Sequence, residues 1–201
     1  MKANYNREII DFYNHKISDQ ERRRSDQEKK EIEQVLAKLK ESLQKEDKVL
    51  DLGCGNGAHV QRVLVEKQID YLGVDFSWKQ LEQALSKKPS SDYLLADFRQ
   101  YENFPKPLKA ILLKQVVQEI AKEELIPLFE KLLKLLDKDG LLFISFDQSR
   151  VLPGEPLLYQ PHFNEIIELA EETGFKLNHL RYSKDEKAWA LLLQCKSGTV
   201  L

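Results

Sequence analysis

The stretch VLDLGCGNG, residues 49–57, places a carboxylate and three glycines directly after an apolar segment. Asp51 is followed by Gly53, Gly55 and Gly57, and glycines let a backbone turn with positive φ and approach a bound molecule closely. Two cofactor signatures overlap in this loop. G-x-G-x-x-A, which ends at Ala58, is typical of dinucleotide sites, whereas D-x-G-x-G-x-G indicates a different cofactor.

The acid that precedes the glycines decides between these two interpretations. The dinucleotide signature gains support from Asp75, which ends the next apolar segment, where an acid would bind a ribose. It leaves Asp51 unexplained, because a negative charge is poorly placed near a pyrophosphate and well placed near the amine of a cationic ligand. We therefore favour the second signature and keep a nicotinamide-dependent oxidoreductase as the less favoured alternative.

The segments around the glycine loop alternate between strand and helix. Apolar runs predict strands at 48–53, 71–76, 91–98, 109–116 and 141–146, and amphipathic segments predict helices at 58–67, 77–88, 122–140 and 162–174. This alternation predicts an α/β protein with a doubly wound, mostly parallel sheet. The last two strands, 175–183 and 187–196, leave no room for a crossover helix and should form an antiparallel hairpin.

Three residues are expected to mark helix ends. Ser77 can cap the start of its helix, and Gly140 and Gly174 can follow the last turns of theirs. In a doubly wound sheet, ligands bind beyond the carboxyl ends of the strands. The glycine loop follows the first strand and should therefore lie at the binding edge.

The first 47 residues are expected to be helical and to form a cap or lid on the domain at 48–201. Their clearest signal is an amphipathic stripe of apolar residues at helical spacing, made by Ile32, Val35, Leu36, Leu39 and Leu43. The preceding segment, SDQERRRSDQEKK, is polar on all sides and suits a solvated surface.

Composition limits the classes of partner. The 201 residues carry a formal net charge of -2, which gives no general reason to bind nucleic acid or an anionic membrane. The two cysteines match no metal-ligand spacing, so no metal is expected and a reduced environment is the simplest expectation. No run of eighteen apolar residues occurs, and the N-terminus lacks an apolar signal segment. We expect a soluble, cytoplasmic protein that acts on a small molecule.

Several segments, taken in order, resemble the class I S-adenosylmethionine-dependent methyltransferases. VLDLGCGNG is similar to their first motif, YLGVDFSWKQLEQA to their second strand and helix, and YLLADF to their third strand. AILLKQVVQEI, LLDKDGLLFISF and ELAEETGFKLNHL continue the resemblance, which covers about residues 48–195. It implies a seven-stranded sheet of order 3-2-1-4-5-7-6 with the last strand antiparallel.

The resemblance also implies the parts of a cofactor site. Asp51 and the loop Gly53, Cys54, Gly55 and Gly57 would hold the amino-acid end of S-adenosylmethionine. The remaining implied contacts are Asp75 and Phe76 for the ribose, Asp97 and Phe98 for the adenine, and Lys114 and Gln115 at the reactive centre. Cys54 is expected to be a small loop residue and not a nucleophile, because no proline-cysteine motif accompanies it.

Two departures from the family leave the substrate side open. Lys109 stands where the family commonly has an acid, and Gln118 and Glu119 stand where it often has histidines. If the acceptor needs a general base, the candidates are Tyr13, His15 and Glu119, with Gln118, Tyr159 and His162 also able to fold over the strand ends. We predict a methyltransferase for a small-molecule acceptor, with a non-catalytic methyltransferase-like binding protein as the alternative.

Overall fold

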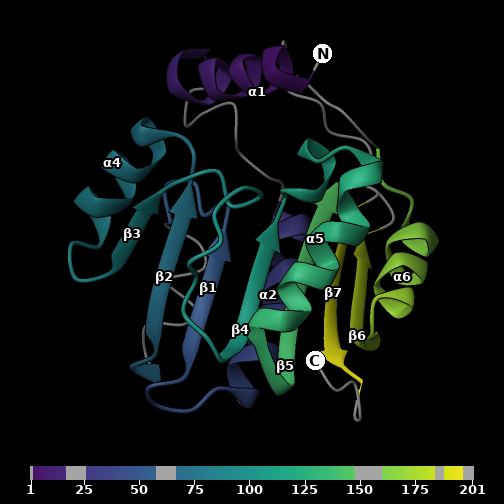
Figure 1. Ribbon diagram of the computed structural model, residues 1–201. Coiled ribbons are helices and arrows are strands. Elements are labelled where there is room, and N and C mark those ends of the chain that lie inside the picture. Colours follow the sequence, from purple (N-terminus) through teal and green to yellow (C-terminus); the bar gives the residue numbers. More distant parts are fainter. Residues whose placement is uncertain (1, 17–25, 58–66, 148–159, 184–187, 197–201) are drawn as a thin grey trace.

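A computed structural model describes residues 2–16, 26–57, 67–147, 160–183 and 188–196. Its central feature is a seven-stranded sheet of order β3-β2-β1-β4-β5-β7-β6 (Figure 1). The strands are β1 Lys48–Leu52, β2 Asp70–Asp75, β3 Asp92–Leu95, β4 Leu108–Lys114, β5 Leu136–Asp147, β6 Phe175–Ser183 and β7 Ala188–Cys195. The first five pair in parallel, and β7 is antiparallel to both β5 and β6, which confirms the predicted topology and hairpin.

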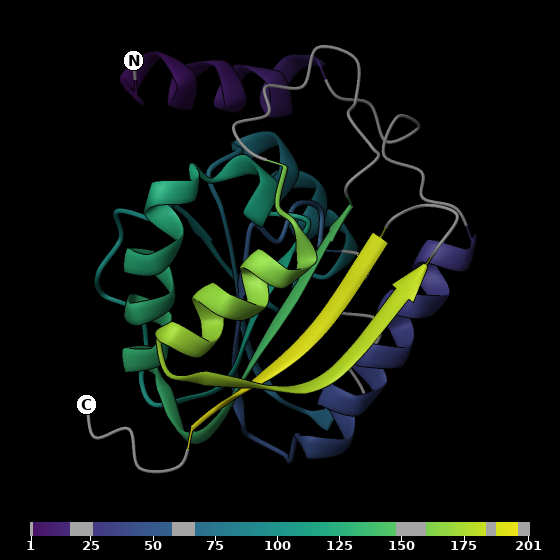
Figure 2. The ribbon, with the colours of Figure 1, turned by 90° about the vertical axis from the view of Figure 1, so that its right-hand side faces the viewer.

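Helices cover both faces of the sheet. The helices are α1 Lys2–Asp11, α2 Asp26–Ser42, α4 Trp78–Lys87, α5 Lys122–Leu135 and α6 Phe163–Glu172, with the short turns η1 Phe12–Lys16 and η3 Val117–Glu119. In the side view of Figure 2, α5 and α6 lie on one side of the sheet and α2 on the other. The predicted helix at 58–67 falls almost wholly outside the described residues.

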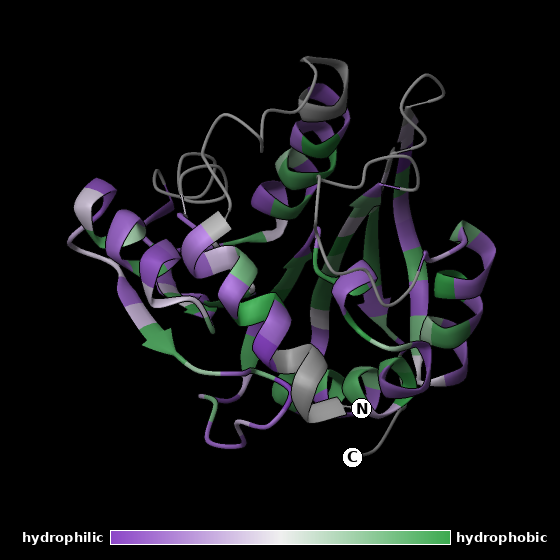
Figure 3. Cartoon of the chain, turned by 90° about the horizontal axis from the view of Figure 1, so that it is seen from above, coloured by the Kyte–Doolittle hydropathy of each residue, from purple (hydrophilic) through white to green (hydrophobic). Residues whose placement is uncertain are grey.

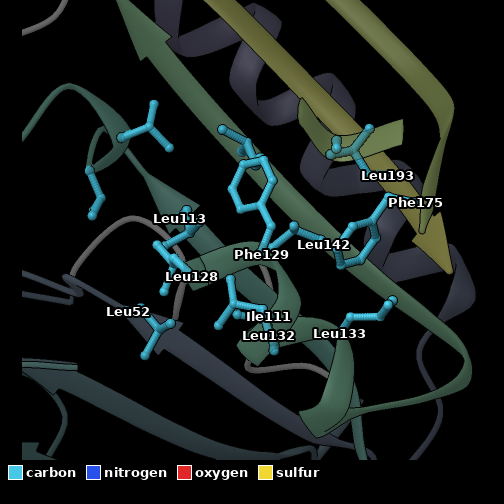
Figure 4. Packing of buried hydrophobic residues seen from close by; sticks show 14 of the residues in the cluster. Leu52, Ile111, Leu113, Leu128, Phe129, Leu132, Leu133, Leu142, Phe175 and Leu193 are labelled. Atoms are coloured by element: carbon cyan, nitrogen blue, oxygen red, sulfur yellow. The ribbon is translucent and has the colours of Figure 1, made fainter. Parts of the chain in front are cut away.

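The strand pattern assigns alternate residues to two cores. Leu50 and Leu52 of β1 join the larger cluster, which contains Phe129 of α5 and Phe175 of β6 (Figure 4). Val49 of β1 joins a second cluster on the opposite face. Successive strand residues point to opposite faces, so a short apolar strand serves both cores.

The amphipathic stripe near the N-terminus packs as predicted. All five of its residues belong to the second cluster, and none is more than 1% exposed: Ile32, Val35, Leu36, Leu39 and Leu43. Helix α2 is therefore a layer of the fold. The segment that lies over the strand ends is α1 with η1, which Figure 3 shows crossing in front of the sheet when viewed from that edge.

Two predicted helix limits are wrong. The first 47 residues are not helical to their end, because a turn at 45–46, with Glu46 at φ 67°, separates α2 from β1. Gly140 does not end α5, which stops at Leu135, and it lies instead within β5 without a positive φ. A Cβ there would meet the Leu136 Cβ at 2.7 Å, so crowding at an irregularity of the strand explains the glycine.

The other two predicted helix ends are confirmed. The Ser77 hydroxyl accepts a hydrogen bond from the Gln80 amide and caps α4. Gly174, with φ 107°, directly follows the Thr173 cap of α6. Among the described helices, none is long and apolar enough to cross a membrane.

Candidate functional site

The glycine loop turns sharply at the carboxyl end of β1. Gly53, Gly55 and Gly57 have φ values of 68°, 55° and 66°, a region that other residues rarely adopt. The amides of Gly53 and Cys54 both donate to the Val74 carbonyl, at 2.8 and 3.0 Å, and so hold the loop against β2. A Cβ on Gly53 would lie 2.5 Å from a Val116 methyl group. Backbone conformation and close packing therefore both require glycine at position 53.

Asp51 is a buried carboxylate at the carboxyl end of β1. It is 1% exposed, and its Oδ2 accepts a hydrogen bond from the Tyr71 hydroxyl at 2.7 Å. Its Oδ1 has no hydrogen-bond partner among the residues that the structure describes. Burial raises the pKa of Asp51 to about 6, although the Tyr71 hydrogen bond and the charge of Lys114 oppose this rise. A buried acceptor without a partner is unfavourable in isolation and suits a donor brought by a ligand.

Asp75 connects the glycine loop to the end of β2. Its Oδ2 accepts from the Gly55 amide and its Oδ1 from the Ser77 amide, both at 2.8 Å. The side chain is 6% exposed and therefore has a fixed position at the edge of the sheet. Next to it, the partly buried ring of Phe76 packs edge-on against Tyr13, with the ring centroids 5.9 Å apart.

The segment after β3 brings Asp97 to the same edge. The Ala96 amide donates to the Asp75 carbonyl at 3.0 Å, which places the two acidic segments side by side. The Asp97 side chain is 20% exposed and paired with Arg99 at 2.8 Å. Phe98 is 4% exposed and belongs to the larger core, so its ring is already packed by the protein.

Two residues leave β4 toward the middle of the edge. Lys114 ends the strand, half-buried, and Gln115 follows with φ 59°. The Gln115 amide donates to the Ser145 carbonyl at 2.7 Å, and its side-chain Oε1 accepts from Gln118 at 3.3 Å. Its Nε2 is buried and without a hydrogen-bond partner within the described part of the chain. It is a second polar atom whose partner a ligand could supply.

The structure brings together two of the three predicted base candidates. The hydroxyl of Tyr13, which is 4% exposed, donates a hydrogen bond to the Glu119 carboxylate. Near β2, the Ser77 hydroxyl donates to the Asn14 side chain at 2.7 Å, so η1 touches the exits of both β2 and β4. Because β1 lies between those strands, η1 crosses above the glycine loop.

The other base candidates lie apart from this pair. His15 is 64% exposed, and its imidazole is 3.9 Å from the Asp11 carboxylate. His162 is an exposed residue at the start of α6, and Tyr159 lies outside the described residues. Gln118 is buried and contacts Gln115.

Cys54 is not arranged as a nucleophile. The pKa of its thiol is raised well above the usual value, chiefly by desolvation and then by the charges of Asp75 and Asp51. A thiol nucleophile needs a lowered pKa. Across the described chain, no group of three or more metal-ligating side chains is arranged to hold a metal ion.

Three contacts of the site were not predicted from the sequence. They are the hydrogen bond of Tyr71 to Asp51, the hydrogen bond of Tyr13 to Glu119, and the ion pair of Arg99 with Asp97. The first had a usable signal, because Tyr71 sits opposite Val49 in the β1–β2 register and so shares a face with Asp51. The second joins residues 106 positions apart and had none.

These residues fit the cofactor that the sequence resemblance implies. The Asp51 Oδ1, which has no partner in the described ranges, suits the ammonium group of an amino acid, and the positive-φ glycines leave room for the backbone to approach it. Asp75 and Asp97 follow on the neighbouring strands, in line across the edge. This line of acceptors suits an elongated molecule that carries an amine, a ribose and an amino-purine.

Comparisons with known proteins agree with the fold. Residues 49–140 match the family model described as a methyltransferase domain. A magnesium protoporphyrin IX methyltransferase from Synechocystis, solved with bound SAH, is 18% identical, with a TM-score of 0.73 over 96% of this chain and 100% of that one. A TehB-like SAM-dependent methyltransferase from Corynebacterium glutamicum is 20% identical, with a TM-score of 0.66 over 82% and 87%.

A third solved structure comes from a different kind of enzyme. The cyclopropane synthase MmaA2 from Mycobacterium tuberculosis is 15% identical, with a TM-score of 0.67 over 81% of this chain and 82% of that one. At these identities the likeness concerns the fold, while the family model covers the glycine loop and the strands that surround it. Residues 49–140 therefore match a methyltransferase domain, and the fold of the chain is that of S-adenosylmethionine-dependent methyltransferases.

Proposed function

We propose that this enzyme transfers the methyl group of S-adenosylmethionine to a small-molecule acceptor. The observation that carries the proposal is the buried Asp51 carboxylate, whose Oδ1 finds no partner among the described residues and lies beside a loop of positive-φ glycines. The small-molecule part is supported by the near-neutral charge of the chain and by neighbours described as acting on magnesium protoporphyrin IX or on sarcosine and dimethylglycine.

The proposed cofactor contacts follow the edge of the sheet. Asp51 and the loop of Gly53, Cys54, Gly55 and Gly57 take the amino-acid end. The next two strands supply Asp75 and Phe76 for the ribose and Asp97 for the adenine, because the Phe98 ring is packed in the larger core. Lys114 and Gln115 border the reactive centre, where the Nε2 of Gln115, without a partner in the part of the chain that the structure describes, is a hydrogen-bond donor for the acceptor or the cofactor.

The protein's own contribution is alignment. Bound S-adenosylmethionine supplies a methyl group already activated on a sulfonium sulfur. Holding an acceptor in line with such a group can lower the barrier by about 7–11 kcal/mol in favourable cases. The closely packed loop and the buried Asp75 suit this task, because neither can shift without breaking backbone hydrogen bonds.

We propose the Tyr13–Glu119 pair as the group that receives a proton from an acceptor that must lose one. Its location above the glycine loop supports this role, as does the hydrogen bond that points the Tyr13 proton at the carboxylate. The phenol oxygen can then accept a proton from the acceptor while passing its own to Glu119. His15 is exposed to solvent and remains the weaker candidate.

Calorimetry and a turnover assay test the proposal in order. Titration with S-adenosylmethionine should show one site, and NADH should show none. Production of S-adenosylhomocysteine is then measured with a panel of small phenols, carboxylic acids, amines and thiols. Binding without turnover on any compound of the panel would favour the non-catalytic binding protein, and absence of binding would contradict the cofactor site itself.

A further inference from the structure

The Asp97 carboxylate is surrounded by hydrogen-bond donors. Its Oδ1 accepts from the Arg99 amide at 3.1 Å and from Arg99 Nε at 2.9 Å. Its Oδ2 accepts from Arg99 Nη2 at 2.8 Å and from Gln100 Nε2 at 3.2 Å. A carboxylate offers about four lone-pair positions, so a ligand donor must replace one of these four.

The four hydrogen bonds to Asp97 differ in strength. The guanidinium binds both carboxylate oxygens in the two-pronged geometry that makes an arginine pair strong and directional. The Gln100 amide is neutral, its side chain is exposed, and its contact is the longest of the four. The position that Gln100 occupies is therefore the one that a ligand can take.

Helix α5 keeps Arg99 in place. The Glu124 carboxylate lies 3.7 Å from Arg99 Nη1. The side chain of Lys131 is only 17% exposed. Its ammonium binds the loop that carries Arg99 through four acceptors: the carbonyls of Phe98, Arg99 and Tyr101 and the Glu102 carboxylate, at 3.3, 3.3, 2.6 and 2.9 Å. The loop, its arginine and the carboxylate are thus held to one helix.

We propose that Arg99 is a positioning residue for adenine recognition. It orients the Asp97 carboxylate so that the exocyclic amino group of adenine can donate to Oδ2 in place of the Gln100 side chain. The inference rests on the proposed function, in which Asp97 meets the adenine, and it adds the residue that sets the choice of base. A 6-oxo purine would present an oxygen to the same carboxylate and be rejected.

The test compares two ligands that differ only at this group, S-adenosylhomocysteine and S-inosylhomocysteine. Calorimetry on the full chain should show that the native protein prefers the amino form by about 10- to 100-fold, the usual value of a hydrogen bond to a charged group. Arg99→Lys, which keeps the charge and loses the fork, should reduce that preference severalfold, and Arg99→Met should nearly abolish it. Gln100→Ala should retain it and bind S-adenosylhomocysteine more tightly.

The ratio of the two dissociation constants is insensitive to general damage. Both ligands are measured on one preparation, so a partly unfolded variant lowers the number of sites and leaves the ratio unchanged. Arg181→Lys, an exposed arginine of β6, is the matched control and should keep the native ratio.

Three outcomes would overturn the inference, and they differ in what else they imply. An unchanged ratio in both Arg99 variants assigns Arg99 a structural role only. Equal affinity of the native protein for both ligands removes adenine recognition by Asp97 and leaves cofactor use intact. No binding of either ligand by the native protein contradicts the proposed function itself.

Discussion

At the scale of single residues, Asp51 and Asp75 are two buried carboxylates with different surroundings. Both oxygens of Asp75 accept backbone amides, so the folded chain itself stabilises its position. Asp51 has one hydroxyl donor and, among the described residues, no partner for its second oxygen, and its pKa is raised to about 6. Asp75 should therefore contribute to cofactor binding mainly by its fixed position, and Asp51 by its negative charge.

Asp75→Ala should reduce affinity for S-adenosylmethionine by about 100-fold or more, because it removes the proposed ribose acceptor and frees the Gly55 amide. Isothermal titration calorimetry measures the effect. Asp70→Ala changes the exposed first residue of the same strand and should bind as the native protein does. An unchanged dissociation constant for Asp75→Ala would refute its assignment.

Asp51 should make stability depend on pH. Its folded pKa of about 6 lies above the unfolded value of 3.8, so the folded chain binds more protons between these values and loses stability as pH rises through them. The free energy of unfolding of the native protein, relative to Asp51→Asn, should therefore fall by about 1 kcal/mol from pH 5 to pH 7.5. Urea unfolding at both pH values measures this, and a parallel dependence in the two proteins would contradict it.

Affinity for the cofactor should also depend on the ionisation of Asp51, but it should rise with pH where stability falls. Above pH 6 the ionised Asp51 can attract an ammonium, and below pH 6 protonation removes that charge. Affinity of the native protein for S-adenosylmethionine should weaken as pH falls from 7.5 to 5, while the already weakened affinity of Asp51→Asn stays nearly constant. Calorimetry across this range distinguishes the two, and an equal slope would exclude Asp51 as the amine contact.

At the scale of elements, α1 with η1 is the segment that can act as the predicted cap. Ile9, Phe12 and Tyr13 form a small cluster of their own, with Phe76 packed against it. This cluster is separate from the two cores of the sheet. The cluster has only three buried residues, so the Tyr13–Glu119 and Ser77–Asn14 hydrogen bonds also help to hold the segment over the loop.

Tyr13→Phe removes only the hydroxyl and leaves the ring packing on Phe76. We expect dissociation of S-adenosylmethionine to become about 5- to 10-fold faster, the effect of one hydrogen bond, with the melting temperature nearly unchanged. Stopped-flow displacement measures the rate, and Glu8→Gln on the exposed side of α1 is the control. An unchanged rate would mean that the bond does not restrain a cap, and a loss of turnover alone would favour the proton-transfer role.

At the scale of the whole molecule, the proposed cofactor site joins four separate strand exits. Its contacts follow β1, β2, β3 and β4, which are neighbours in the sheet, so a bound molecule restrains about half of the sheet edge at once. Ligands that bind only the folded state stabilise it in proportion to their occupancy. The effect belongs to the fold and not to any single contact.

S-adenosylmethionine at 100 times its dissociation constant should raise the free energy of unfolding by about 2.7 kcal/mol and the melting temperature by about 5–10 °C. Differential scanning fluorimetry measures the shift. NADH at the same concentration should produce none, and an equal shift with NADH would restore the dinucleotide alternative.

Much of the fold could be predicted because its signals are local. The five-residue stripe of α2 and the alternation around Asp51 follow from helical and strand periodicity. Gly140 shows the limit of such signals, since a glycine after a helical pattern can serve as a cap or relieve crowding within a strand. Only the packing against Leu136 distinguishes the two.

The sequence by itself determined the alternation of strands and helices, the hairpin at the end and the placing of the acids after successive strands, because each depends on neighbours along the chain. The tertiary structure decided which side chains meet. It paired Tyr13 with Glu119, which are 106 positions apart, set Tyr71 on Asp51, 20 positions away, and exposed His15, because such contacts depend on strand order and on where the helices pack.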